Sequence, residues 1–253
     1  MIKKKIGLIC CTVGISFGVQ AFTFEGRLFG SVATSEVGGF VQIPQGGSDG
    51  STSYQRPSLN ELRIIHNNFY TLGTLLSFNE YDLFFHFSRY APHGNALLNE
   101  TLLTHGKVIN AGQVLATFLK YDYYVLGLGK RFYHERWTIF PFLQVNFLKF
   151  HYEYASFPIK GARTFNVSGS NLGLKIAYQL THAISADLTM TPPLPITNFT
   201  QSEIEFGINK LIPLSSHLAL LPRFSLVLQQ FDYEDNQGVP NHIRIQNAPY
   251  GKI

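Results

Sequence analysis

Polar and apolar side chains alternate with a period of two along much of this chain, which is the pattern of β-strands whose two faces lie in unlike environments. In the segment Asn171–Leu180, leucine, isoleucine and tyrosine occupy even positions, while asparagine, lysine and glutamine fall on odd positions. The segments Ile184–Met190, Glu203–Asn209 and Lys149–Tyr154 repeat this alternation. Helical periodicity is scarce, so the pattern predicts an all-β chain.

The alternating segments predict about ten strands, within a range of about eight to twelve. Several are longer than the roughly 5–6 residues usual in soluble sheets and match the roughly 9–11 residues of a tilted transmembrane strand. They are Phe22–Val32, Asn60–Leu76, Tyr81–Tyr90, Val114–Gly127, Thr138–Tyr154, Asn171–Leu180, Ile184–Met190, Glu203–Asn209, His217–Glu234 and His242–Gln246.

The connections between these strands alternate in length. Short turns are predicted at Ser77–Tyr81, Lys130–Arg136, Leu180–Ala183 and Pro213–His217. Longer segments are predicted at Ala33–Ser58, Ala91–Gln113, Phe157–Thr164, Thr191–Gln201 and Asp235–Asn241. Short turns at one end and long loops at the other are typical of outer-membrane barrels. The fold class predicted is therefore a single antiparallel transmembrane β-barrel.

The amino terminus has the three parts of a secretory signal peptide. Lys3, Lys4 and Lys5 precede an apolar run, and small residues precede a predicted cleavage site after Ala21. The alternative is a membrane anchor, but the apolar run is shorter than the roughly 20 residues of a spanning helix. We expect residues 1–21 to be a signal peptide and residues 22–253 to form one outer-membrane barrel domain.

Composition changes once the signal peptide is set aside. Cys10 and Cys11 both lie within it, so the remaining chain offers no disulfide, thiol nucleophile or thiolate metal site. Removing its three lysines from the 20 basic residues leaves 17 against 16 acidic ones, a net charge of +1, which gives no argument for nucleic-acid binding. Charged residues make up 14% of the chain, against about 25% in typical soluble proteins.

No motif for catalysis, metal binding or cofactor binding stands out. The nine histidines include no His-x-x-x-His pair, and the glycine-rich stretch at residues 46–50 lacks the lysine of a phosphate-binding loop. His182 and Ser185 would lie on opposite faces of a strand. We therefore predict no cofactor and no enzyme. One enzyme alternative remains, a protease in which a histidine meets Glu153, Asp232 or Glu234 at the outer rim.

The stretch KFHYEY, Lys149–Tyr154, raises the question of which face meets which environment. Its aromatic residues fall on even positions, whereas the alternating apolar residues of the preceding FLQVNFL fall on odd positions. Ser225–Glu234 changes in the same way, from apolar residues on even positions to aromatic residues on odd ones. A β-bulge is predicted in both strands. An outer aromatic girdle is then predicted from Phe150, Tyr152, Tyr154, Phe231 and Tyr233. The predicted polar cluster of the lumen or rim is Lys149, His151, Glu153, Asp82, His86, Lys120, Asp122 and Arg223.

The residues predicted to face inward carry both signs of charge. Such a mixed set can pair across a narrow lumen and close it, whereas a set of one sign would indicate an ion-selective pore. A barrel of about ten strands is little wider than one filled by its own side chains. A wide diffusion pore is not expected, whereas a narrow pore remains an alternative.

Taken together, the signal peptide, alternating strands and unequal connections resemble the small Gram-negative outer-membrane β-barrel proteins, porin-like and adhesin-like barrels included. The resemblance implies contact with outer-membrane lipid and lipopolysaccharide, insertion by the barrel-assembly machinery, and either a narrow lumen for solutes or surface loops that bind an unknown ligand. No functional residue carries over. Such barrels usually end in Phe or Trp, whereas this chain ends QNAPYGKI, with Tyr250 and Ile253 as substitutes and Pro249 within the closing strand.

Two other functions remain alternatives from sequence alone. The first is an outer-membrane enzyme acting on lipid A, phospholipid or peptide, which needs a histidine beside a serine or carboxylate at one rim. The second is a soluble, secreted β-barrel that binds an apolar ligand, which needs the long aromatic strands to face inward. An apolar outer belt would exclude the second alternative.

Overall fold

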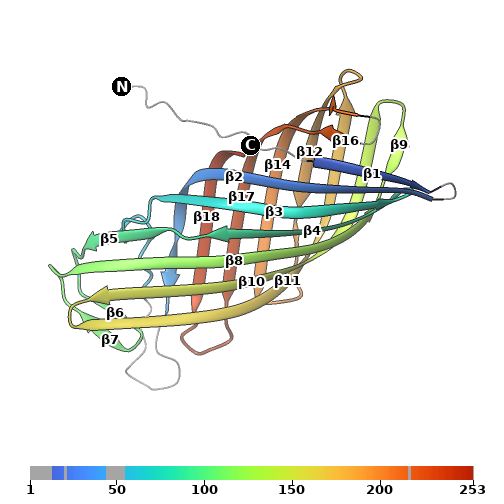
Figure 1. Ribbon diagram of the computed structural model, residues 1–253. Coiled ribbons are helices and arrows are strands. Elements are labelled where there is room, and N and C mark those ends of the chain that lie inside the picture. Colours follow the sequence, from blue (N-terminus) through green and yellow to red (C-terminus); the bar gives the residue numbers. More distant parts are fainter. Residues whose placement is uncertain (1–12, 20–21, 44–54, 216–217, 253) are drawn as a thin grey trace, which may run out of the picture.

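The computed structural model describes residues 13–19, 22–43, 55–215 and 218–252, and in these residues the chain is all-β (Figure 1). Ten antiparallel strands form a closed barrel, because the last strand pairs with the first. They are β2 (Phe22–Gln42), β3 (His66–Phe78), β4 (Tyr81–Tyr90), β8 (Val114–Lys130), β10 (Trp137–Ser156), β11 (Ile159–Gln179), β12 (Ile184–Thr191), β14 (Phe199–Lys210), β17 (Arg223–Glu234) and β18 (His242–Lys252). The predicted fold class is confirmed.

The other strands are short additions to this barrel. β1 (Val13–Val19) pairs with the start of β2 and with β16 (Leu218–Leu220). The rest are β5 (His93–Leu97), β6 (Leu102–Thr104), β7 (Lys107–Ile109), β9 (Phe132–His134), β13 (Pro193–Leu194) and β15 (Ile212–Pro213). Residues 1–12 and 20–21 lie outside the described residues, so the signal peptide stays a prediction. Cleavage after Ala21 would remove β1 and leave all ten barrel strands, since β2 begins at Phe22.

Connections differ between the two ends of the barrel, as predicted. We call the end with the β3–β4 and β11–β12 turns the turn end, and the opposite end the loop end, at the left of Figure 1. Two predicted loops are wrong. Phe157–Thr164 is largely strand, because β10 and β11 pair without interruption up to Ser156 and Ile159, and β2 continues to Gln42 where a loop was expected from Ala33. None of the described residues forms a helix that could cross a membrane.

An apolar belt surrounds the outside of the barrel. Its members are exposed although they are large and hydrophobic, which is unusual for a protein in water. Every barrel strand from β2 to β17 contributes, through Leu28, Val32, Tyr70, Leu72, Leu83, Phe85, Leu126, Leu128, Leu143, Val145, Phe147, Leu172, Leu188, Ile204, Phe206, Ile208, Phe224, Leu226 and Leu228.

Aromatic side chains mark both borders of this belt. Toward the loop end, the Tyr70 and Phe87 rings are 6.1 Å apart and the Phe87 and Tyr124 rings 4.9 Å apart, while Phe147 lies opposite Tyr124 on the next strand. Toward the turn end, exposed rings come from Phe78, Tyr81, Phe132, Tyr133 and Trp137. We call the first row the outer girdle.

Beyond the outer girdle, the outward side chains become polar on neighbouring strands. The next outward residues after Val32, Tyr70, Phe87, Tyr124 and Phe147 are Thr34, Asn68, Arg89, Asp122 and Lys149. The inward side chains change in the opposite sense, from Gln144 and Asn146 to Phe150, Tyr152 and Tyr154, all five of them buried. We call the part of the barrel beyond the outer girdle, with its loops, the crown.

The β17–β18 ladder has a register shift between Val227 and Gln229, close to the bulge predicted in β17, but the extra residue belongs to β18. β10 pairs continuously with both neighbours, so the predicted bulge near Leu148 is wrong. In β17, Ser225, Val227, Gln229 and Phe231 all face inward, so its phase is constant too. The extra residue lies in β18 between Asn247 and Lys252, the segment that contains Pro249. Since proline donates no ladder hydrogen bond, a bulge is where a strand tolerates it.

Candidate functional site

The predicted polar cluster of the lumen or rim divides between the two faces of the barrel wall. Asp82, His86 and Arg223 face inward. Lys149, His151 and Glu153 face outward on β10, and Lys120 and Asp122 face outward on β8. The lumen alternative is therefore wrong for these five residues, and the rim alternative stays a prediction. These five lie beyond the outer girdle, on the polar outer face of the crown.

The predicted aromatic girdle is also wrong. Phe150, Tyr152, Tyr154 and Phe231 are 1–2% exposed and belong to the buried core, and the partly buried Tyr233 packs against it. The physical reason is that side chains keep their regular alternation along the strand, while the apolar and polar environments change places between the two faces of the barrel wall. Below the outer girdle the outside is apolar and the inside polar, and above it the outside is polar and the inside apolar.

An ion-pair network fills the interior toward the turn end. The Arg223 guanidinium donates from Nη1 and Nη2 to the two oxygens of Asp187, at 2.6 and 2.8 Å. Arg223 Nη2 also lies 3.2 Å from Glu205 Oε1. Lys175 Nζ lies 3.5 Å from Asp187 Oδ1, and Lys252 Nζ lies 4.0 Å from Glu205 Oε1. Because Asp187 and Glu205 are buried, this network compensates charges that water does not reach freely.

A layer of amides and phenols lies above the ion pairs. Asn146 accepts hydrogen bonds from Tyr123 Oη and Gln144 Nε2, both at 3.0 Å, and donates to Asn171. Tyr90 Oη donates to Gln229 Oε1 at 3.1 Å, and Gln229 Nε2 donates to Glu203 at 2.9 Å. Such a network joins side chains from opposite walls and leaves few polar groups for a passing solute.

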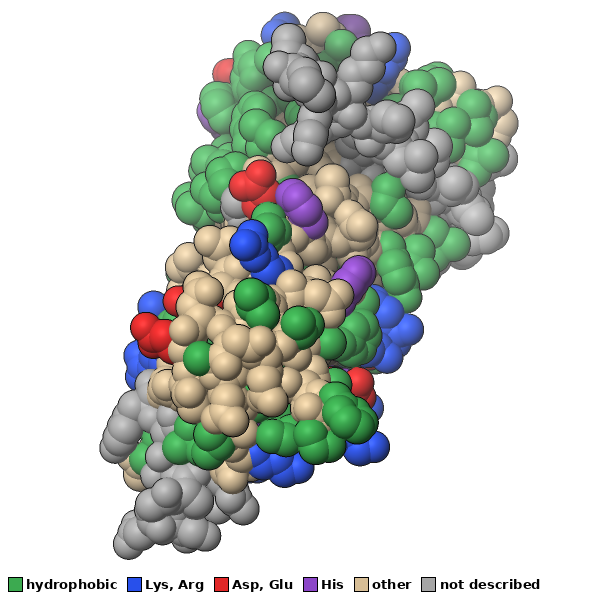
Figure 2. All heavy atoms as spheres, turned by 90° about the vertical axis from the view of Figure 1, so that its left-hand side faces the viewer, with side chains coloured by type: hydrophobic (Ala, Val, Ile, Leu, Met, Phe, Trp, Pro, Cys, Tyr) green, Lys and Arg blue, Asp and Glu red, His purple; other side chains and the backbone are tan. Residues whose placement is uncertain are grey.

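Stacked rings close the barrel at the level of the crown. Tyr90 stacks on Tyr121 with centroids 4.2 Å apart, and Phe231 touches the Tyr121 and Tyr123 rings at 5.6 and 5.1 Å. Loop residues cover this layer, since Leu59, Leu62, Ile64 and Ile109 are 0% exposed and Leu102 is 6% exposed. Figure 2, which faces the loop end, shows packed atoms and no opening across the coloured part of this face.

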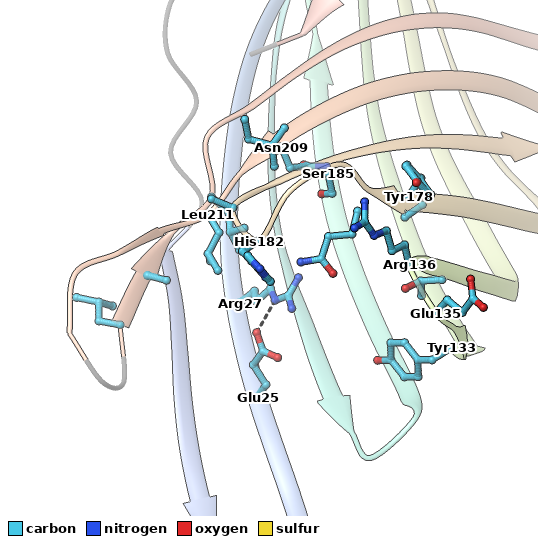
Figure 3. A pocket seen from close by; sticks show the side chains of 18 of the residues that line it. Glu25, Arg27, Tyr133, Glu135, Arg136, Tyr178, His182, Ser185, Asn209 and Leu211 are labelled. Carbon is cyan, nitrogen blue, oxygen red and sulfur yellow. Dashed lines mark hydrogen bonds and ion pairs between the residues drawn. The ribbon is translucent and has the colours of Figure 1, made fainter.

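A cavity of about 520 Å³ opens at the turn end (Figure 3). Its side chains project into a common space from β2 (Arg27), β12 (Ser185), β14 (Asn209) and the β9–β10 turn (Arg136). Arg27 donates from Nε to Glu25 at 2.6 Å. The ion-pair network forms the floor of this end, since Asn209 also hydrogen-bonds Asp187 and Arg223. The cavity is thus a vestibule that the layers above block.

Two histidine clusters with carboxylates occur on the outer side of the crown. His151 lies 2.8 Å from Glu153 Oε1 and 2.7 Å from Thr164 Oγ1 across the β10–β11 ladder. This is an acid–imidazole–hydroxyl chain, the order found in hydrolase triads. It lies on an open sheet face, however, and lines neither the vestibule nor the narrow fissure described below.

The second cluster places His242 between two carboxylates. Its Nε2 lies 2.9 Å from Asp232 Oδ1 and its Nδ1 lies 3.1 Å from Glu234 Oε2. Arg244 also reaches Asp232, at 2.5 Å, and the Phe40 ring packs edge-on against the imidazole at 4.8 Å. The rim cluster that was left open for Asp232 and Glu234 therefore exists, with a buried His242 packed against Phe40 and with Glu234 and Arg244 partly exposed. Among the described residues, no group of three or more histidine, aspartate or glutamate side chains has an arrangement that could hold a metal ion.

His105 links a loop to the crown core. Its ring lies 4.7 Å from the Tyr154 ring and 5.8 Å from the Tyr152 ring, and its backbone N–H donates to Ile43 O at 2.9 Å. Burial, and then the nearby Arg163 and Lys107, lower its pKa from 6.5 to about 4. The contribution of neutral His105 to stability is therefore complete above pH 6.5 and is lost as the pH falls toward 4.

Sequence reasoning missed the residues that close the barrel. Leu59, Leu62 and Ile64 lie in the β2–β3 connection, part of which was predicted as strand, and Ile109 lies in the β4–β8 connection. Glu61–Ile64 alternates polar and apolar residues as a strand would, so the hydrophobic pattern carries no signal that Leu62 and Ile64 fold over the interior.

Comparisons with known proteins give little further information. No protein-family model matches the chain, and no curated protein matches it. Among solved structures it is similar to Ail, the attachment invasion locus protein of Yersinia pestis, with 9% identity and a TM-score of 0.32 over 88% of this chain and 97% of that one. Ail in complex with the heparin analogue sucrose octasulfate matches over the same shares with 9% identity and a TM-score of 0.30. Scores this low support no argument about ligand or partner.

Proposed function

We propose that this protein is an integral outer-membrane β-barrel without catalytic activity, whose lumen is closed and whose crown binds a partner outside the cell. The observation that carries the proposal is the exposed apolar belt around a closed barrel. Along β10 the belt runs from Trp137 to Phe147, which corresponds to about 25 Å of height for a strand tilted by about 40°. The apolar band of outer-membrane barrels is about 25 Å tall.

The belt also argues against the soluble alternative. A secreted barrel for an apolar ligand would hide its aromatic strand residues, whereas here Phe85, Phe147, Phe206 and Phe224 are 40–49% exposed. Burial of such a surface in lipid removes the cost of exposing it to water. In this proposal the loop end faces outward, the crown contacts lipopolysaccharide at the outer girdle, and the barrel-assembly machinery inserts the chain.

Tyr250 was a candidate substitute for the terminal aromatic residue, yet it faces inward, is 5% exposed and packs on Phe69 with centroids 5.0 Å apart. Ile253 lies outside the described residues.

Membrane fractionation combined with conductance recording tests the proposal. We expect the protein to remain with the outer membrane after a carbonate wash, and to migrate faster on a gel before heating than after it. In planar bilayers the purified protein should give no lasting conductance steps, because the aromatic layer and loops block the lumen. A protein that stays soluble without detergent would refute the membrane assignment, and steady conductance would refute the closed lumen.

A further inference from the structure

One strand of the crown has a free edge. β11 pairs with β10 along its whole length, but on its other side it pairs only with β12, from Leu174 to Gln179, and with β13 at Ser170 and Asn171. From Ile159 to Gly169, no strand among the described residues pairs with this second side. At Gly169 the barrel wall is still close, since an added Cβ would meet Phe199 O at 2.8 Å. Beyond Gly169 the wall is open.

The side chains of this segment are less buried than those of its neighbour. On β10 the inward Phe150, Tyr152 and Tyr154 are 1–2% exposed. On β11 the inward Phe165, opposite Phe150, and Val167, opposite Leu148, are only partly buried against the same core. Phe165 contacts the Tyr233 ring across the opening, with centroids 5.5 Å apart, and a narrow apolar fissure of about 10 Å³ lies beneath them.

The backbone polarity of the free edge can be assigned. Lys160 O accepts a hydrogen bond from Lys107 Nζ at 2.8 Å, and Lys107 lies outside the β10–β11 hairpin, so this carbonyl points away from β10. In an antiparallel ladder, alternate residues point their N–H and C=O groups to the same side. The unpaired groups therefore belong to Ala162, Thr164, Asn166 and Ser168. Alternating donors and acceptors with this spacing match the backbone of another extended chain.

The charge beside this edge is positive. Lys107, Lys160 and Arg163 make no ion pair with any described residue, and Arg163 lies over the Phe165 ring at 5.8 Å. On the neighbouring strands, Glu153 already contacts His151, and Asp232 already contacts Arg244 and His242. Two copies of this edge would place their cations together, which disfavours self-pairing.

We propose that the edge of β11 from Ala162 to Ser168 binds an extended, acidic polypeptide segment by adding it to the crown sheet as a further strand. The orientation of this edge toward the outside rests on the proposed function. The added strand would pair the four residues with free backbone groups, cover Phe165 and Val167, and bring acidic side chains to Lys160 and Arg163.

The experiment uses the full chain in lipid nanodiscs and a fluorescent ten-residue peptide of alternating valine and glutamate, with binding measured by anisotropy. We expect saturable binding, and at least tenfold weaker binding for the same peptide N-methylated at alternate residues or with lysine in place of glutamate. Equal binding of the N-methylated peptide would overturn strand addition. Absence of binding by the valine–glutamate peptide, or equal binding of the lysine peptide, would overturn the acidic partner.

Variants of the protein locate the site. Thr164→Pro removes an edge N–H and should weaken binding at least tenfold relative to Thr164→Ala, which loses the same contact with His151 but keeps the N–H. Arg163→Glu should weaken binding more than Lys120→Glu, which makes the same charge change two strands away. If either pair binds alike, the edge of β11 is not the site. Unheated gel migration checks folding of each variant, and fractionation tests the proposed function separately, since it does not depend on this edge.

Discussion

Replacing Arg223 by leucine is expected to lower the free energy of unfolding by about 3–5 kcal/mol, the cost typical of removing one partner from a buried ion pair. Arg223 bridges Asp187 and Glu205, whose side chains are 1% and 12% exposed. Without the guanidinium, two carboxylates from neighbouring strands share a space in which only Lys175 and Lys252 remain, at 3.5 and 4.0 Å.

Urea titration of the protein in lipid vesicles, followed by the fluorescence of the single tryptophan, Trp137, measures this loss. The matched control is Arg27→Leu, because the Arg27–Glu25 pair is about one-third exposed and is expected to contribute at most about 1 kcal/mol. The double variant Arg223→Leu, Asp187→Leu should recover part of the loss, since it removes a charge together with its partner. Equal stability of Arg223→Leu and Arg27→Leu would show that the interior network is solvated and not structural.

Replacing Phe231 by alanine is expected to cost about 3–5 kcal/mol, because the change leaves a cavity in a packed core. The ring is 2% exposed and contacts four other rings, those of Tyr90, Tyr121, Tyr123 and Phe199. These contacts join β17 to β4, β8 and β14, so the cavity would loosen the layer that closes the barrel.

The matched control for this prediction lies on the same strand with the opposite parity. Phe224 is 49% exposed and belongs to the outer belt, so lipid chains can fill the space that Phe224→Ala leaves. Circular dichroism and urea titration of the two variants should therefore differ clearly, with Phe231→Ala the less stable. A larger loss for Phe224→Ala would contradict the assignment of Phe231 to the packed inner face of β17 and of Phe224 to the outer belt.

The period of two was sufficient to predict the strands, because it depends only on which faces of a strand differ. All ten barrel strands overlap a predicted segment, and Arg223, which was predicted for the lumen or rim, faces inward. The parity says that two environments differ, however, and does not say which one is lipid, water or core. Phe150 and Phe147 are equally apolar in sequence, yet one is 1% exposed and the other 49% exposed.

The change of phase in KFHYEY therefore had two physical explanations. A bulge would shift the chain, and an exchange of environments would leave the chain regular. The second is found, and its cause lies far away in the sequence, in Leu59, Leu62, Ile64 and Ile109, which fold over the interior and make it apolar. Polar outward residues at the same level of other strands, such as Asn68 and Arg89, agree with this explanation. By contrast, Pro249 was singled out correctly, because proline lacks the backbone N–H of a ladder hydrogen bond and β18 has its bulge there.

The exchange of environments at the outer girdle is tested most directly by thiol reactivity along β10. The single variants Phe147→Cys, Lys149→Cys, Phe150→Cys, His151→Cys and Tyr152→Cys would each carry one thiol, because residues 22–253 contain no native cysteine. In the membrane-inserted protein, the thiol at 147 should react with a lipid-soluble maleimide, those at 149 and 151 with a water-soluble one, and those at 150 and 152 with neither. Reaction of the thiols at 150 and 152 with the lipid-soluble reagent would contradict the account.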